Sequence, residues 1–211
     1  MLVTIQHVKQ SLKLSNFDSF QAQMGMSPSG REQMLPKRDN PPRQSAVLVL
    51  ICETPTDDLQ LILTKRTDHL RGHSGQVSFP GGSCDADDPS YEHTALRETC
   101  EEIAVCDTSH IQLLGRLSKM WIPPSNFEVV PVVASMAYKP EMNPSPDEVA
   151  QILTLSLTTL LDEKTKKTTP MKFRGTTFDV PYYDVAGQIV WGATAAMLSE
   201  LEHRLKVVLS A

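Results

Sequence analysis

Three glutamates near the middle of the chain have the spacing of a metal-binding helix face. Glu98, Glu101 and Glu102 stand at i, i+3 and i+4 in a segment that we predict to be helical. Side chains at these offsets share one face of a helix, with Cβ atoms about 5–6 Å apart. Mg²⁺ and Mn²⁺ prefer oxygen ligands and commonly bridge one or two carboxylates to substrate phosphates. The spacing therefore predicts a divalent-metal site able to act on a pyrophosphate.

The residues around this helix would position the glutamates. A Gly81-Gly82 turn precedes it and lets the backbone approach a ligand closely, because glycine has no Cβ. Asp88 followed by Pro89 predicts the start of the helix, with a capping side chain and then a residue of fixed φ. Wheel geometry predicts an apolar back to the helix, formed by Leu96, Cys100 and Ile103.

A purely structural explanation of the acidic face stays open at this point. Like charges at helical spacing cost only about 0.2–0.5 kcal/mol per pair, so they do not require a counter-ion. Arg97 can also pair with Glu101 at i+4, which gives one of the three glutamates a structural use. Spacing alone does not separate a metal site from a solvated surface.

The stretch around the three glutamates resembles the Nudix box, G-x5-E-x7-R-E-U-x-E-E-x-G-U, where U is aliphatic. Gly82, Arg97-Glu98, Glu101-Glu102 and Val105 fall on this pattern. The resemblance implies that the glutamates bind Mg²⁺ or Mn²⁺, that Arg97 organises them and that Gly82 offers its carbonyl to a metal. It also implies hydrolysis of a nucleoside diphosphate linked to another group.

Three positions depart from the box. Asp88 stands in place of its first glutamate, with one extra residue before Arg97. Thr99 replaces an aliphatic residue and can pack through its methyl group. Ala104 replaces the closing glycine, where a left-handed conformation would cost a non-glycine residue roughly 1–2 kcal/mol. None of these changes removes a metal ligand.

A longer pattern lies immediately upstream of the box. The stretch from Leu63 to Gly82 resembles the signature of the coenzyme A pyrophosphatase branch, LLTKRS-x2-LR-x-H-x-GQV-x-FPGG, with Thr67 in place of serine. This resemblance implies cleavage of coenzyme A and its derivatives to 3′,5′-ADP and (acyl-)4′-phosphopantetheine. Arginine can grip a phosphate through two parallel donors, which suits such a substrate. The expected substrate-binding residues are Lys65, Arg66, Arg71, His73 and Gln76, although each can also be explained as a strand end or loop organiser.

A general base outside the box is expected on a later loop. Glu148 is our first candidate and Glu128 the second, and an exposed loop carboxylate explains either residue equally well. The loop that begins at Trp121 and the pair Tyr182-Tyr183 could line a nucleotide or pantetheine pocket by stacking. Core or rim positions are the alternative for these aromatic residues.

The order of the elements predicts one layered domain. Strands grouped around two well-separated helices favour an α/β/α sandwich with a mixed sheet, and the resemblance makes it a Nudix-type sandwich with a loop-helix-loop catalytic motif. Residues 1–44 are expected to form an N-terminal helix and an extended arm, and residues 45–211 the Nudix hydrolase domain. We expect a hairpin of strands 46–51 and 59–64, strands at 77–79, 111–117, 129–137, 148–155 and within 171–191, and helices at 157–161 and 192–208.

Composition restricts the setting of the protein. The chain has 211 residues and a formal net charge of -5, with no strongly basic block, which argues against nucleic acid as a partner. Its start lacks the pattern of a secretory signal, and no apolar run approaches the roughly 20 residues of a membrane helix. The four cysteines form no C-x-x-C pair, so we expect reduced thiols in the cytoplasm. A homodimer is left open.

Two other functions are compatible with the same residues. One is a Nudix pyrophosphatase for another nucleoside diphosphate derivative, such as ADP-ribose or a dinucleotide cofactor. The other is a Nudix domain that binds coenzyme A without hydrolysing it, against which the intact Glu98, Glu101 and Glu102 argue.

Overall fold

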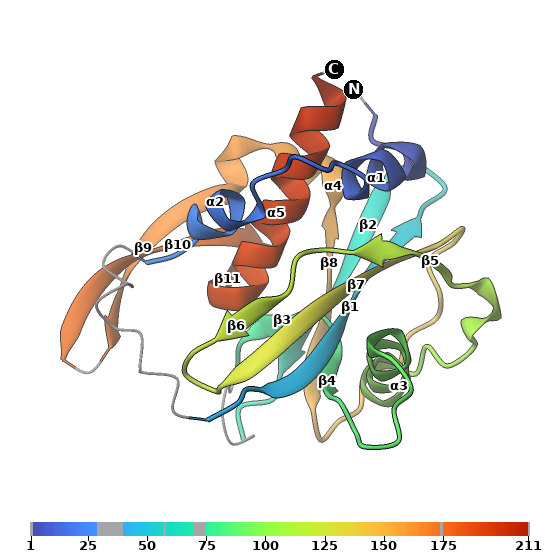
Figure 1. Cartoon of the computed structure of the whole chain (residues 1–211), viewed down its shortest axis with the longest axis horizontal. Helices are drawn as coiled ribbons and strands as arrows, with labels where there is room; N and C mark the ends of the chain where they lie inside the picture. The colour runs from blue at the N-terminus through green and yellow to red at the C-terminus, as the bar shows by residue number, and fades with distance from the viewer. Residues whose placement is uncertain (1, 29–39, 57, 70–74, 174, 211) are drawn as a thin grey trace.

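The computed structural model describes residues 2–28, 40–56, 58–69, 75–173 and 175–210. These residues form a mixed sheet of eight strands, a separate sheet of three strands, and helices packed around the larger sheet (Figure 1). The larger sheet consists of β1 (Arg43–Glu53), β2 (Leu59–Arg66), β3 (Val77–Ser78), β4 (Gly81–Ser83), β5 (Gln112–Arg116), β6 (Met120–Ile122), β7 (Phe127–Met136) and β8 (Val149–Ser156). The smaller sheet consists of β9 (Lys166–Phe173), β10 (Thr176–Val185) and β11 (Gln188–Val190).

The helices come from both ends and from the middle of the chain. They are α1 (Ile5–Leu12), α2 (Ser19–Met24), α3 (Tyr91–Ile103), α4 (Leu157–Leu161) and α5 (Gly192–Leu209), with short 3-10 turns η2 (Thr108–His110) and η3 (Glu163–Thr165). Within the described ranges, no helix combines the length and the apolar character that a membrane span requires.

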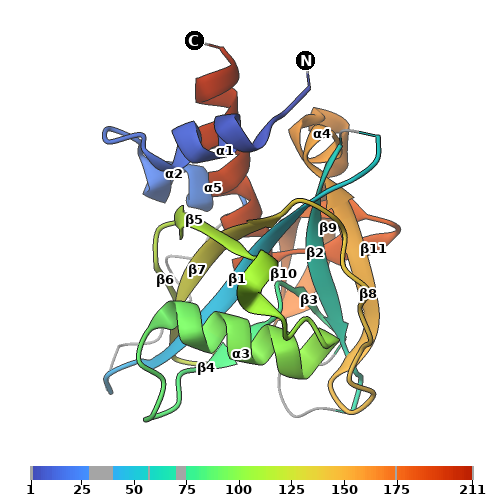
Figure 2. The ribbon, with the colours of Figure 1, turned by 90° about the vertical axis from the view of Figure 1, so that its right-hand side faces the viewer.

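β1 is the central strand of the larger sheet because both of its faces are buried. Residues 43–52 of β1 pair in parallel with the whole of β7, and β1 pairs antiparallel with β2 and β4, which makes the sheet mixed. Its alternating side chains belong to two separate hydrophobic clusters, one with α3 and one with α5 (Figure 2). The side chains on the α3 side are Ala46, Leu48, Leu50 and Cys52, and those on the α5 side are Val47, Val49 and Ile51. This arrangement confirms the predicted α/β/α sandwich.

The N-terminal helices pack against α5 rather than extending away from the domain (Figure 2). Glu200 of α5 is fully buried and accepts hydrogen bonds from Gln23 (2.8 Å), Ser118 Oγ (3.0 Å) and Arg204 Nε (2.9 Å). This buried carboxylate therefore fastens the start of the chain to its last helix. The boundary at residue 45 stays a prediction, and β1 itself begins at Arg43.

Most predicted elements are present, and the differences have local causes. The hairpin, α4 and α5 lie where they were expected, and Ile51 of β1 faces Leu61 of β2. Gly81 and Gly82 lie in the short strand β4 instead of a turn, because they pair with Val47 and Ala46. The segment 171–191, predicted as one or two small strands, belongs to a three-stranded sheet that begins at residue 166, and β6 was not predicted.

Candidate active site

Glu98 is seated against the backbone of Gly82 in β4. A Cβ at position 82 would lie 2.4 Å from Cδ of Glu98 and 2.5 Å from each carboxylate oxygen. Such distances are far inside van der Waals contact, so only glycine leaves room for the carboxylate at this place. The side chain of Glu98 is 16% exposed, and its burial raises the pKa of the carboxyl group.

Glu102 lies one helical turn further along α3 and is more deeply buried, with 2% of its side chain exposed. Thr64 of β2 donates a hydrogen bond to its carboxylate (3.4 Å), and the Arg66 guanidinium lies 3.9 Å from the other oxygen. Burial raises the pKa of Glu102 to about 8, the charges of Glu148 and Glu98 raise it as well, and Arg66 opposes them. A buried carboxylate is thus held beside other carboxylates.

Glu148 is brought to this region by the loop that follows β7. The amide of Ser145 donates to the carbonyl of Glu102 (2.8 Å), and the amide of Asn143 donates to the carbonyl of Ile103 (3.0 Å). The amide of Thr67 in turn donates to the carbonyl of Glu148 (3.0 Å). The loop is therefore fixed to the end of α3 and to the end of β2.

The carboxylate of Glu148 is close enough to raise the pKa of both Glu98 and Glu102. Its placement suits the predicted base, although that role stays a prediction. Glu128, the second candidate, lies in β7, where its carboxylate pairs with Lys119 at 3.4 Å.

Arg97 organises the outer side of the site. Its guanidinium donates to Asp88 (2.9 and 3.2 Å), to Glu98 (3.1 Å), to Glu101 (3.4 Å) and to the carbonyl of Ser83 (3.0 Å). These hydrogen bonds from Arg97 hold the pKa of Asp88 well below its usual range. Glu101 is the most exposed of the three glutamates, at 58%. The arginine thus ties the loop before α3 to two of the glutamates.

The start of α3 differs from the prediction because Arg97 binds the side chain that was expected to cap the helix. The helix begins at Tyr91, and Ser90 is its N-cap, accepting a hydrogen bond from the amide of His93 (3.2 Å). The prediction that Asp88 caps the helix was wrong, because its carboxylate is engaged by Arg97, which lies nine residues later. The apolar back also differs, since Leu96 and Cys100 are half-buried while the buried positions are Thr94, Ala95, Thr99, Glu102 and Ile103.

The chemistry of these side chains fits a divalent cation. Among the residues that the structure describes, no three His, Cys, Asp or Glu side chains are already gathered around one metal position. Glu98 and Glu102 are nevertheless desolvated, and neighbouring carboxylates raise the pKa of both, Glu101 and Glu148 that of Glu98, and Glu148 and Glu98 that of Glu102. A hard cation between such oxygens would neutralise this repulsion, and carboxylates are the ligands that Mg²⁺ and Mn²⁺ prefer. Metal ligation by Gly82, Glu98, Glu101 and Glu102 stays a prediction.

The structure places the predicted substrate-binding residues differently from one another. Arg66 lies beside Glu102, and its buried Nε has no hydrogen-bond partner among the described residues. Lys65 lies between Thr64 and Arg66, the two residues of β2 that contact Glu102, at the point where β2 shifts register against β8. Gln76 accepts a hydrogen bond from the amide of Arg66 through its carbonyl (3.0 Å). Arg71 and His73 lie outside the described residues.

Sequence reasoning missed Thr64, which donates directly to Glu102. The available signal was the alternation of β2, because a strand that presents Arg66 to the site must also present Thr64. For Tyr183 the structure agrees with the core alternative. It is fully buried and its hydroxyl donates to Glu202 of α5, so it is a core residue and does not line a pocket. Trp121 is half-buried and donates from Nε1 to Asn126 (3.0 Å).

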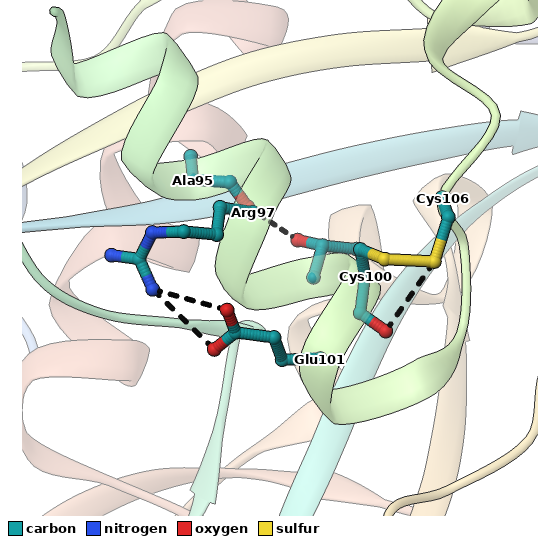
Figure 3. Close-up of a disulfide and its surroundings, with 6 residues drawn as sticks. Ala95, Arg97, Cys100, Glu101 and Cys106 are labelled. Atoms are coloured by element: carbon teal, nitrogen blue, oxygen red, sulfur yellow. Dashed lines mark hydrogen bonds and ion pairs between the residues drawn. A yellow bond between two sulfur atoms is a disulfide. The ribbon is translucent and has the colours of Figure 1, made fainter. Parts of the chain in front are cut away.

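A disulfide closes the end of the acidic helix and contradicts the prediction of four reduced cysteines. Cys100 lies in the last turn of α3 and is bonded to Cys106 beyond its end (Figure 3). Ala104 ends the helix in the left-handed conformation (φ 61°, ψ 26°), as expected for the position of the box glycine. This turn brings the two Cα atoms to 4.5 Å. Cys52 and Cys84 are free. The cytoplasmic location was inferred from reduced thiols, so it is no longer supported by the cysteines and stays a prediction.

The fold and the site together define a class of protein, an α/β/α sandwich with an acidic loop-helix-loop suited to metal-assisted hydrolysis. Comparison with known proteins is more specific. The family model described as NUDIX domain matches residues 42–172. The chain therefore belongs to the Nudix hydrolase family. Members generally use divalent metal ions, and membership implies hydrolysis of a pyrophosphate bond in a nucleoside diphosphate derivative.

Individual relatives agree with this assignment. An uncharacterized Nudix hydrolase, NudL, of Pectobacterium atrosepticum is 39% identical over 165 residues, covering 75% of this chain and 81% of that protein. The protein of the same name from Yersinia pestis is 34% identical, covering 78% and 81%.

Solved structures support the fold alone, because their sequence identity is low. RenU, a Nudix hydrolase from M. smegmatis, has a TM-score of 0.53 at 12% identity, covering 80% of this chain and 86% of that one. A MutT protein from Methanosarcina mazei Go1 has a TM-score of 0.52 at 15% identity, covering 82% and 99%.

The raised pKa of Glu102 predicts a pH-dependent stability. Its folded value of about 8 lies above the ordinary 4.5, so the metal-free folded protein loses stability as the pH rises from 4.5 to 8. Glu102→Gln carries no charge and removes this loss. The difference between these two values is about 3.5 pKa units and one unit corresponds to about 1.4 kcal/mol, so we expect the free energy of unfolding of the variant at pH 8 to exceed that of wild type by up to about 4 kcal/mol.

Urea unfolding with a chelator present measures this difference at pH 5 and pH 8. The two proteins should be nearly equal at pH 5, and the exposed substitution Glu141→Gln should change neither value. A Glu102→Gln variant that is less stable than wild type at pH 8 contradicts the argument.

The left-handed Ala104 predicts a stabilising substitution. Glycine adopts this conformation without the Cβ penalty, so Ala104→Gly should raise the free energy of unfolding by about 1 kcal/mol. Ala193→Gly, in the right-handed α5, is the matched control and should lower the free energy. Urea unfolding of both variants checks the signs, and a loss of stability in Ala104→Gly would show that this end of the helix carries no strain.

The disulfide predicts a redox-dependent stability. Closing the short loop between Cys100 and Cys106 restricts the unfolded chain and is expected to contribute about 2 kcal/mol. Dithiothreitol should therefore lower the Tm of wild type and leave the Tm of Cys106→Ser unchanged. Cys84→Ser is the control, because Cys84 is free and should preserve the response to the reductant. A wild-type Tm that is the same with and without dithiothreitol contradicts the prediction.

Proposed function

We propose that the protein hydrolyses the pyrophosphate bond of coenzyme A and its derivatives, giving 3′,5′-ADP and (acyl-)4′-phosphopantetheine. One observation carries the proposal. The stretch that resembles the coenzyme A branch, Leu63 to Gly82, supplies the end of β2, the strand β3 and the start of β4, and both β2 and β4 contact the acidic helix. Within it, Thr64 and Arg66 contact Glu102, and Gly82 makes room for Glu98.

The charges of the substrate support the choice. Coenzyme A carries a pyrophosphate and a 3′-phosphate, so its site needs several cations close to the metal. Arg66 lies 3.9 Å from Glu102 with 27% of its side chain exposed, and can donate to a phosphate oxygen while it stays beside the carboxylate. We assign phosphate and substrate binding to Arg66 together with Lys65, Arg71, His73 and Gln76.

The acidic residues have separate roles in the proposed reaction. Glu98, Glu101 and Glu102, with the carbonyl of Gly82, are the proposed ligands of Mg²⁺ or Mn²⁺. When bound, such a cation polarises a phosphoryl oxygen and lowers the pKa of a bound water. Arg97 is a positioning residue, because it holds Glu98 and Glu101 without facing the deeper Glu102.

Glu148 is the proposed base of the reaction. Its carboxylate takes the proton of the attacking water as the new P–O bond forms. The bond from that phosphorus to the bridging oxygen then breaks, and the second phosphate leaves with this oxygen. The carboxylate of Glu148 lies near Glu98 and Glu102 but comes from a loop and not from α3. It can therefore accept a proton from the water without being a metal ligand.

The proposal predicts a specific product. Wild type with Mg²⁺ or Mn²⁺ should release 3′,5′-ADP from coenzyme A, and Glu102→Gln should lower kcat by at least about 100-fold. Replacing a residue that hydrogen-bonds to a metal ligand already lowers metal affinity or activity about 10–100-fold, and replacing the ligand itself should lower activity further. Glu92→Gln is the matched control on the same helix, because Glu92 pairs with Arg116 outside the site. Chromatographic detection of the product measures all three.

A substrate panel decides between related activities. Coenzyme A, acyl-coenzyme A, ADP-ribose and NADH are ranked by kcat/KM, since discrimination between substrates lies in this ratio. Preference for ADP-ribose or the dinucleotide would overturn the assigned substrate. Tight binding of coenzyme A with no product from wild type would instead indicate a non-catalytic binding domain.

A further inference from the structure

A concave surface lies beside the strands that contact Glu102, and of its described lining residues only Gln76 has been given a role above. It is a pocket of about 440 Å³ between the start of β3 and the small sheet. We call it the glutamine pocket, because two glutamine side chains line it. Its lining includes Gln76, Met171, Gln188, Ile189 and Trp191.

The glutamine pocket is joined to the active site by short contacts. The carbonyl of Gln76 accepts a hydrogen bond from the amide of Arg66 (3.0 Å), and the guanidinium of Arg66 lies 3.9 Å from Glu102. Thr64, which donates to Glu102, faces Ser78 across the β2–β3 pair. Two extended residues span about 7 Å, so Gln76, which directly precedes β3, lies about that far along the chain from Ser78, the residue opposite Thr64.

The far wall of the pocket is fixed to the same strand. Thr194, near the start of α5, donates from Oγ1 to the carbonyl of Val77 (3.0 Å). Trp191 is the N-cap residue of that helix and lies only three positions earlier. The small sheet is therefore anchored beside the catalytic strands at this point, and β11 contacts β3. The pocket therefore lies beside β3, which pairs with the end of β2 that carries the Glu102 partners Thr64 and Arg66.

The lining has a definite chemistry. The described residues of the lining carry no charged side chain, which does not suit the phosphates or the 3′-phosphorylated ribose of a nucleotide. Met171, Ile189 and Trp191 offer apolar walls, and the amides of Gln76 and Gln188 each carry both donors and an acceptor. The volume falls within the range of about 300–1,000 Å³ that is usual for small-molecule sites. A neutral chain that alternates methylene groups with amides matches these features.

We propose that the glutamine pocket holds the pantetheine arm of the substrate, and that Gln188, Ile189 and Trp191 determine specificity for this arm. The inference rests on the proposed function, because only a coenzyme A derivative presents such an arm next to its pyrophosphate. Pantetheine has two secondary amides, which Gln76 and Gln188 can pair with, and a dimethyl group and methylenes for the apolar walls.

The test compares two substrates that differ only in the arm. One is coenzyme A, and the other is the methyl ester of 3′-phospho-ADP, which keeps the nucleotide and the pyrophosphate. Gln188→Ala and Ile189→Asp should each lower kcat/KM for coenzyme A about tenfold, mainly through KM, because each removes one contact with the arm. Neither should change kcat/KM for the methyl ester. Ile189 is 42% exposed, so its replacement should not disturb folding.

Val207→Asp is the control, because Val207 is a similarly exposed apolar residue on α5 outside the pocket lining. This substitution should leave kcat/KM unchanged for both coenzyme A and the methyl ester. Equal losses on both substrates, or no loss on either, would overturn the pocket assignment while leaving the activity in place. Equal losses would assign the pocket to the nucleotide half, because both substrates share it. Failure of wild type to hydrolyse coenzyme A would overturn the proposed function itself, and the pocket assignment with it.

Discussion

The site depends on the burial of like-charged carboxylates beside a glycine backbone. Glu98 and Glu102 are both withdrawn from water, and Glu148 adds a third charge from a separate loop. Charges in such a place are unfavourable unless a cation or hydrogen-bond donors compensate them. Gly82 supplies the space, while Thr64 and Arg66 supply partial compensation from β2. The remaining compensation is what a divalent metal would provide.

Several other features serve to hold these carboxylates in place. Arg97 fixes Glu98 from the outer side and is itself fixed by Asp88, which lies before the helix. At the other end, the Cys100–Cys106 disulfide and the left-handed Ala104 turn the chain back immediately after Glu102. The loop that carries Glu148 is hydrogen-bonded to the same end of the helix. The acidic helix is therefore restrained at both termini, so its glutamates cannot separate to relieve their repulsion.

The sequence predicted those parts of the structure that depend on local pattern. The apolar run of β1, its hairpin with β2 and the helical spacing of the glutamates all require only neighbouring residues. The different burial of Glu98, Glu101 and Glu102 could not be predicted from their spacing, because it depends on where the sheet edge lies. Resemblance to the Nudix box, and not the spacing, separated a metal site from a solvated surface.

Other features were missed because a distant or unusual partner decides them. Asp88 has the sequence of a helix cap but is bound by Arg97, so Ser90 takes the cap position. The disulfide depends on the left-handed turn at Ala104, which brings together cysteines that are six positions apart. The extent of β9 to β11 was underestimated because these strands carry many polar residues and show little of the alternation that marks a half-buried strand.

Mn²⁺ binding by the protein without substrate tests the central claim most directly. Titration calorimetry of wild type, Glu98→Gln, Glu102→Gln and Glu92→Gln separates the buried carboxylates from another glutamate of the same helix. Wild type and Glu92→Gln are predicted to bind Mn²⁺ with the same affinity, and the other two variants at least about tenfold more weakly, as loss of a metal ligand requires. Equal binding by all four proteins, or none by wild type, would contradict the account.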